Sequence, residues 1–127
     1  MKKIFMIIGM FLLASQAFAA DVPLYWTAPG DDGPVGTAAS YDIRWSLNPI
    51  TETNWDQATQ VTGEPTPAIF GTTQSMVVTG LVSKTVHFFA MKALDAVGNV
   101  SLLSNVLQVT TVDDMPPSAI TDLRDTP

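Results

Sequence analysis

Residues 85–95 read T-V-H-F-F-A-M-K-A-L-D, and this stretch decides which fold the chain adopts. Side chains of an extended strand alternate between two faces, so the stretch divides into two sets. Lys92 marks its own set as the one that faces solvent, and His87 and Phe89 therefore point inward. The strand is expected to end at Asp95, because a Gly-Asn pair that suits a tight turn follows it.

Other segments of the chain show the same two-residue period, in which side chains alternate between two faces. Y-D-I-R-W-S (41–46) alternates strictly between apolar and polar residues, which is typical of a half-buried strand. Segment 55–61 is expected to form a short edge strand, whereas the prolines of 63–67 lack the N–H that a central strand needs. About six short strands with regular turn signals predict an all-β fold, a two-sheet antiparallel sandwich. The other predicted strands are 22–27, 75–81 and 104–112.

The N-terminus has the pattern of a secretory signal peptide. Two lysines precede the apolar run 4–13, and A-F-A at 17–19 offers the small residues that a signal peptidase cuts after. We expect cleavage after Ala19, with cleavage after Ala20 as the second choice. The run is too short for a membrane span. The mature chain is therefore expected to be secreted, extracellular or periplasmic, in a bacterium, with no membrane insertion after cleavage.

Charge and cysteine content exclude several classes of function. Residues 20–127 contain twelve acidic and four basic residues, which gives a formal charge of −8. Phosphate backbones and anionic membranes repel such a chain, so no nucleic acid partner is expected. The chain has no cysteine, which removes thiol nucleophiles and disfavours soft-metal sites.

No motif in the sequence indicates catalysis, a cofactor or a metal. Zinc spacings, phosphate loops and the G-x-S-x-G elbow are all missing. Asp31 and Asp32 lie in a Gly-rich stretch, but they lack the alternating oxygen ligands of a calcium loop, and solvation explains them better. Asp113 and Asp114 are interpreted in the same way. We therefore expect no enzyme activity, no cofactor and no metal site.

Several stretches together resemble a fibronectin type III domain of the bacterial secreted type. L-x-x-x-T-x-H-x-F-x-M-x-A-x-D and the following G-N-x-S-x-x-S-N, within 81–105, resemble strand F, the FG loop and the start of strand G. L-Y-W-T-A-P-G-D-D-G (24–33) resembles strand B, and 41–46 resembles strand C. The resemblance covers about residues 22–112 and implies an immunoglobulin-like sandwich domain over residues 20–112.

The resemblance also implies a role for His87. At this position the family usually carries a tyrosine whose hydroxyl bonds back to the chain near the E–F corner. His87 is therefore expected to be structural rather than catalytic or metal-binding, and its strand face offers Phe89 and Met91 instead of carboxylate or serine partners. The predicted structural core comprises Trp26, Tyr41, Ile43, Trp45, Val78, Leu81, His87, Phe89 and Met91.

The resemblance implies an exported, non-catalytic interaction or spacer module. Its partner would be a protein or a cell-surface polymer, and the predicted partner surface comprises Phe88, Leu94 and Val106, which would point outward from the C–F–G sheet. Two alternatives stay open: an N-terminal accessory module of a larger secreted hydrolase, and a carbohydrate-binding module. The second would need Trp55 to stack on a sugar ring, although packing over the sheet edge is the simpler expectation for this side chain.

The ends of the domain predict an open strand edge. In this family a strand A pairs with strand B, yet here the signal peptide ends just before 22–27, so strand A is missing. Residues 113–127 begin as a Pro-rich linker, and 119–123 resembles strand A of a truncated next module. An unpaired edge invites another strand. We therefore expect that residues 20–127 either self-associate, with 116–123 donated to the next molecule, or melt easily as a truncated and marginally stable product.

Overall fold

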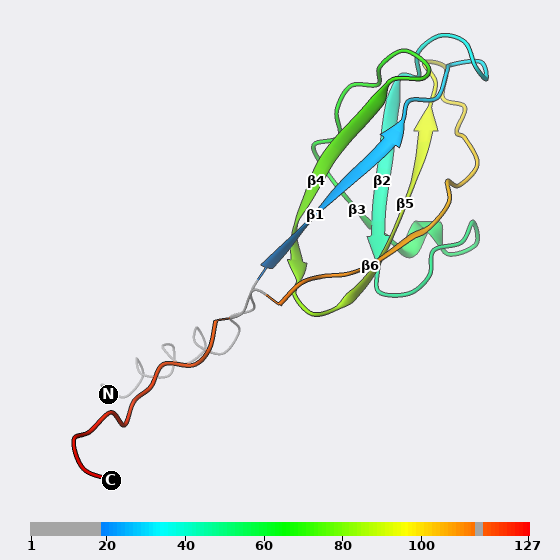
Figure 1. Cartoon of the computed structure of the whole chain (residues 1–127). Helices are drawn as coiled ribbons and strands as arrows, with labels where there is room; N and C mark the ends of the chain where they lie inside the picture. Colours follow the sequence, from blue (N-terminus) through cyan, green and yellow to red (C-terminus); the bar gives the residue numbers. More distant parts are fainter. Residues whose placement is uncertain (1–18, 114–115) are drawn as a thin grey trace, which may run out of the picture.

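Short alternating strands build two antiparallel sheets that pack face to face as an immunoglobulin-like sandwich (Figure 1). The computed structural model describes residues 19–113 and 116–127. The larger sheet has the order β3-β2-β5-β6, and the smaller sheet pairs β1 with β4. This architecture confirms the predicted all-β, two-sheet fold class. The elements are β1 Ala19–Thr27, β2 Ser40–Ser46, the 3-10 turn η1 Trp55–Gln57, β3 Thr59–Gln60, β4 Thr73–Val82, β5 Val86–Leu94 and β6 Leu107–Thr110.

Strand β5 contains the stretch that decides the fold, and it lies in the middle of the larger sheet between β2 and β6. Its register with β2 places Ile43 opposite Met91 and Trp45 opposite Phe89. Such cross-strand apolar pairs are the units that stabilise a sheet. The matching period of the two strands therefore fixes their register.

The smaller sheet leaves one edge of β1 unpaired. Ala20, Val22 and Leu24 are buried and alternate with exposed residues, and a register shift separates Ala20 from Val22. Within residues 19–113 and 116–127, β4 is the only strand that pairs with β1. The described part of the chain thus has no strand on the other edge of β1, where the first strand of an immunoglobulin-like sandwich would lie.

One apolar core fills the space between the sheets. Its buried members are Val22, Leu24, Ile43, Val78, Leu81 and Phe89. Of the predicted core residues, Trp26, Trp45 and Met91 are half-buried against this cluster. The remaining six are buried, namely Tyr41, Ile43, Val78, Leu81, His87 and Phe89.

The turn between β4 and β5 is tied to the end of β6. The hydroxyl of Thr111 donates to the carbonyl of Val82 at 2.6 Å. Lys84, which has a positive φ of 55°, donates its N–H to the carbonyl of Val112 at 3.2 Å. Val82 also pairs with Ala19 at the start of β1. The chain therefore leaves the sandwich at the end where β1 begins.

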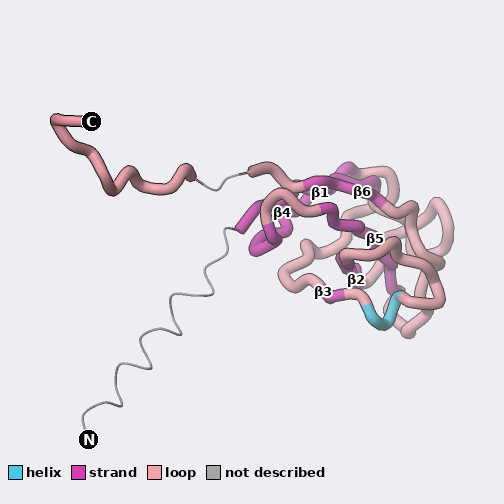
Figure 2. The backbone as a smooth tube through the Cα atoms, turned by 90° about the horizontal axis from the view of Figure 1, so that it is seen from below, coloured by secondary structure: helices cyan, strands magenta, loops and turns pink. Residues whose placement is uncertain are grey.

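Four segments differ from the predicted strands. In the predicted edge strand 55–61, residues 55–57 form η1 and only Thr59–Gln60 form a strand, β3. β1 begins at Ala19 rather than at residue 22, and β6 covers only part of the predicted 104–112. Residues 116–127 form no strand, and the tail lies away from the sandwich in both views (Figure 1, Figure 2). Except for Ala19, the predicted signal peptide lies outside the described residues.

Candidate functional site

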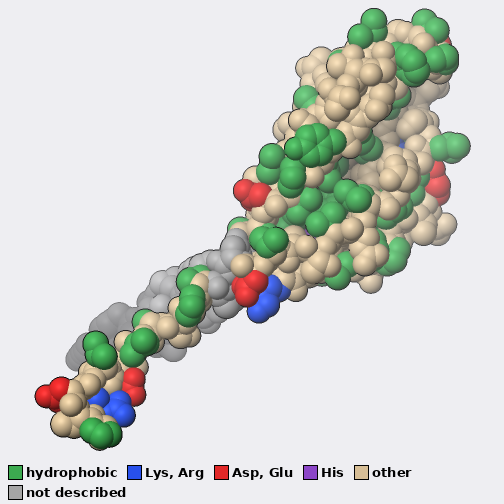
Figure 3. Space-filling model, viewed as in Figure 1, with side chains coloured by type: hydrophobic (Ala, Val, Ile, Leu, Met, Phe, Trp, Pro, Cys, Tyr) green, Lys and Arg blue, Asp and Glu red, His purple; other side chains and the backbone are tan. Residues whose placement is uncertain are grey.

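A groove runs along the open edge of β1. It encloses about 440 Å³, within the range of about 300–1,000 Å³ that ligand pockets occupy. Residues 24–27 of β1 form one wall, β5 forms the floor and residues 101–107 form the opposite wall. Hydrophobic side chains gather in this hollow on the face shown in Figure 3. The apolar lining comes from Leu24, Trp26, Phe89, Met91 and Leu107.

The backbone of β1 turns unused hydrogen-bonding groups toward the groove. In an antiparallel pair, residues that bond to the partner strand alternate with residues that face away from it. Ala28 bonds toward β4, because its N–H donates to the carbonyl of Thr72 at 2.7 Å. By alternation, the backbone N–H and C=O groups of Tyr25 and Thr27, and the C=O of Pro23, point away from β4. Proline has no N–H, so this edge offers two N–H donors and three carbonyl acceptors.

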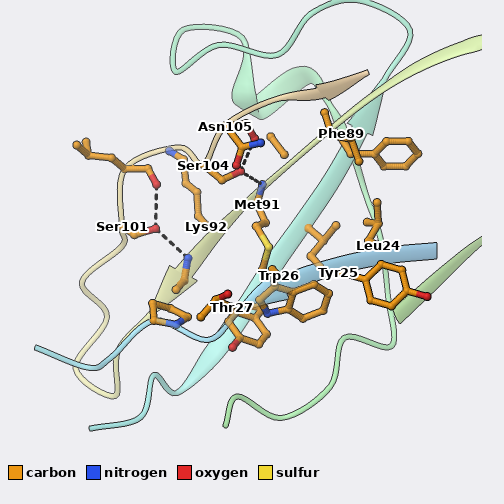
Figure 4. Close-up of a pocket in the computed structure, with 17 residues that line it drawn as sticks. Leu24, Tyr25, Trp26, Thr27, Phe89, Met91, Lys92, Ser101, Ser104 and Asn105 are labelled. Atoms are coloured by element: carbon orange, nitrogen blue, oxygen red, sulfur yellow. Dashed lines mark hydrogen bonds between the residues drawn. The ribbon is translucent and has the colours of Figure 1, made fainter. Parts of the chain in front are cut away.

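The opposite wall is built with serine side chains instead of a strand. The Oγ of Ser101 accepts the N–H of Ala93, and the Oγ of Ser104 accepts the N–H of Met91, both at 2.9 Å (Figure 4). Between the pairs Phe89–Leu107 and Leu94–Val100, β5 advances by five residues while the opposite segment advances by seven. The serines therefore satisfy the edge of β5 while the extra residues keep this segment from pairing as a regular strand.

Trp26 contributes an unsatisfied donor beside the groove. Its ring packs edge-on against Tyr41, with 5.3 Å between ring centroids, and Met91 extends from β5 toward it (Figure 4). The indole Nε1 is buried and has no hydrogen-bond partner among the described residues. A buried donor without an acceptor costs about 1–3 kcal/mol.

His87 lies in the core and has no access to a ligand. Its side chain is 0% exposed and packs between Trp45 and Phe89, with centroid distances of 5.2 and 6.4 Å. The ring Nδ1 lies 3.1 Å from the carbonyl of Thr85. Because a carbonyl only accepts, Nδ1 carries the proton in this bond, and Nε2 has no partner within the described part of the chain. This placement is that of a packing residue bonded to the β4–β5 turn.

Trp55 is a packing residue rather than an exposed platform. It is 7% exposed and forms a second apolar cluster with Ile50 and Ala90. The guanidinium carbon of Arg44 lies 4.6 Å from the ring centroid, and Nζ of Lys92 lies 5.0 Å from it. These are cation–π contacts. The indole face is thus covered and is not available to stack on a sugar.

The predicted partner surface of Phe88, Leu94 and Val106 is not one open patch. Phe88 does lie on the face of β5 opposite His87, but it packs against the cluster of Ile50 and Trp55. The expectation of a free Phe88 side chain is therefore corrected, because the segment between β2 and β3 covers this face. Leu94 is half-buried and Val106 is exposed.

The acidic residues organise loops. Asp95 caps its own turn: its Oδ1 accepts the N–H groups of Val97 and Asn99 at 3.0 and 2.8 Å, and its Oδ2 accepts Nδ2 of Asn99 at 2.7 Å. These bonds, led by the one from the Asn99 side chain, hold the pKa of Asp95 below its ordinary value. No three acidic or histidine side chains in the described residues gather as a metal site would require.

No protein-family profile matches the chain, and no curated protein matches it significantly. Among the helices of residues 19–113 and 116–127, none is long and apolar enough to cross a membrane. Within the described residues, the groove beside β1 combines an unpaired strand edge with an apolar lining.

Proposed function

We propose that this chain is an exported, non-catalytic interaction module of the fibronectin type III kind, and that it binds an extended polypeptide along the edge of β1. The observation that carries the proposal is an unpaired strand edge that borders an apolar groove. A polypeptide added to such an edge gains affinity from main-chain hydrogen bonds. It gains specificity from pockets that receive alternate side chains.

The chemistry of the groove suits a peptide strand. The outward N–H groups of Tyr25 and Thr27 are two residues apart, which matches the repeat of an antiparallel partner. The apolar lining would bury alternate side chains of the bound peptide. Burial contributes a favourable transfer free energy of about 25 cal/mol per Å² of apolar surface. A sugar ring would instead need an exposed aromatic face, and the ring of Trp55 is covered.

Export is supported by the N-terminal pattern of lysines, apolar run and small residues. Cleavage after Ala19 would make Ala20 the first residue of the mature chain. Ala20 is buried and pairs with Leu81, so the mature chain would begin inside β1. No residues would then precede β1 to cover its open edge.

Two substitutions test the binding mode. Tyr25→Pro removes an outward N–H from β1, and the ring at Pro23 shows that an outward position of this strand accommodates proline. The Tyr25 side chain is 72% exposed, so its loss leaves the core intact. Val97→Asp is the matched control, because Val97 is an exposed apolar residue on the loop after β5.

Peptides would be selected from a displayed random library on the full chain, and their affinities measured by titration calorimetry. We expect selected peptides to alternate apolar and polar residues, to lose binding to Tyr25→Pro and to keep binding to Val97→Asp. A library without binders, or peptides that bind all three proteins equally, would contradict the proposal.

A further inference from the structure

We infer that the groove of one molecule receives residues 116–123 of a second copy of this chain, as an added strand antiparallel to β1. The inference rests on the proposed function, because it names the occupant of the same groove. It follows from the composition of the C-terminal tail, from the shape of the groove and from the point where the tail leaves the sandwich.

The tail has the pattern of a strand, but it pairs with no strand in the described part of the chain. Its side chains Ile120 and Leu123 are 79% and 90% exposed. In an extended conformation Ala119, Thr121 and Leu123 share one face, and Ile120 lies on the other. Burial of these two exposed aliphatic side chains would contribute a favourable transfer free energy of about 25 cal/mol per Å² of apolar area.

The face that carries Leu123 is complementary to the groove. An added strand would turn this face toward the core, where Leu24 and Met91 offer apolar contacts. Thr121 would share this inner face and pack against the apolar lining. Ile120 would then lie on the outer surface beside the exposed ring of Tyr25.

A molecule cannot fill its own groove in this direction. An antiparallel strand on β1 begins beside Thr27, but the tail leaves the sandwich at the Ala19 end. β1 has 9 residues, and at about 3.3 Å per residue its ends lie about 26 Å apart. The donated segment begins at residue 116, and the three residues 113–115 that precede it reach at most about 11 Å when fully extended.

A second copy meets no such limit. Each molecule then offers one tail and one groove, so the contact is head to tail and not symmetric. Contacts of this type produce open chains unless the rotation between copies closes a ring. The structure thus predicts association that grows with protein concentration.

The test uses one variant for each side of the contact. Leu123→Asp disables the tail without touching the folded sandwich, because Leu123 is exposed. Tyr25→Pro disables the groove edge, and Leu107→Glu, at an exposed position of the groove wall, is a second groove variant should Tyr25→Pro unfold. Val97→Asp serves as the control in a region that the contact does not use. Thermal unfolding checks that every variant keeps its fold.

Sedimentation velocity of the full chain over a wide concentration range gives the readout. We expect the wild type and Val97→Asp to associate, and each single variant to remain monomeric. An equimolar mixture of Leu123→Asp and Tyr25→Pro should form one-to-one heterodimers and nothing larger, because only one intact groove and one intact tail then remain per pair.

A wild type that stays monomeric at all concentrations would overturn the inference. So would variants that associate like the wild type, or a mixture that forms no heterodimer. If library peptides bind the groove of a strictly monomeric wild type, the inference fails and the proposed function stands. If neither the tail nor any peptide binds, both fail.

Discussion

Replacing His87 separates its packing from its polar role. Phenylalanine keeps an aromatic ring between Trp45 and Phe89 and removes both ring nitrogens. The lost bond to the Thr85 carbonyl is worth about 1 kcal/mol, and that carbonyl still accepts the N–H of Thr111 at 3.0 Å. The substitution also removes the buried Nε2, which has no partner among the described residues and whose burial costs about 1–3 kcal/mol.

His87→Phe should therefore range from neutral to about 2 kcal/mol more stable than the wild type. His87→Ala, in contrast, leaves a cavity at a position with no solvent exposure and should lose about 3–5 kcal/mol, as other aromatic-to-alanine changes in cores do. Urea unfolding measures both, with an unchanged dependence on denaturant as the sign of an intact fold. If His87→Phe were destabilised as much as His87→Ala, the imidazole nitrogens would contribute more to stability than the packing of the ring does, and the reasoning would be refuted.

Three further outcomes follow from the structure. Trp55→Ala should cost about 3–5 kcal/mol in urea unfolding, since the ring is buried and contacts Arg44 and Lys92; an unchanged midpoint would show that the ring is not packed. Because hydrogen bonds lower the pKa of Asp95, its stabilisation of the 95–99 turn should be complete above the ordinary value of about 3.9 and lost as pH falls through the lower folded value. The amide shift of Asn99 in an NMR pH titration reports this loss, and a shift that changes near neutral pH instead would count against it. The intact mass of the exported chain should equal that of residues 20–127. A mass that includes the first nineteen residues would refute cleavage after Ala19.

The fold could be predicted from the sequence because its strands carry their own pattern. In 85–95, alternation and a single lysine were enough to separate the inner face from the outer one, and the same holds for 41–46. The open edge of β1 could also be predicted, since no strand fits between the predicted signal peptide and residue 22. Each of these inferences needs only local period and chain length.

The candidate site depends on contacts that local patterns do not carry. Phe88 is covered by Ile50 and Trp55, which come from a segment with no strand pattern. The groove exists because Ser101 and Ser104 bond to β5 in place of a regular strand. Hydroxyls of this kind look like ordinary turn residues in a sequence, so the hollow beside β1 becomes visible only in three dimensions.

Amide hydrogen exchange along β1 tests the central claim most directly. The N–H groups of Leu24 and Trp26 point toward β4, by the same alternation as that of Ala28, and should be protected in every sample, which makes them internal standards. Tyr25 and Thr27 should be protected in concentrated wild type and exchange freely on dilution or in Leu123→Asp, because only a donated strand can bond to them. Free exchange of Tyr25 and Thr27 in concentrated wild type would contradict donation of the tail to the edge of β1, and protection that persists in the dilute monomer would contradict donation by a second copy.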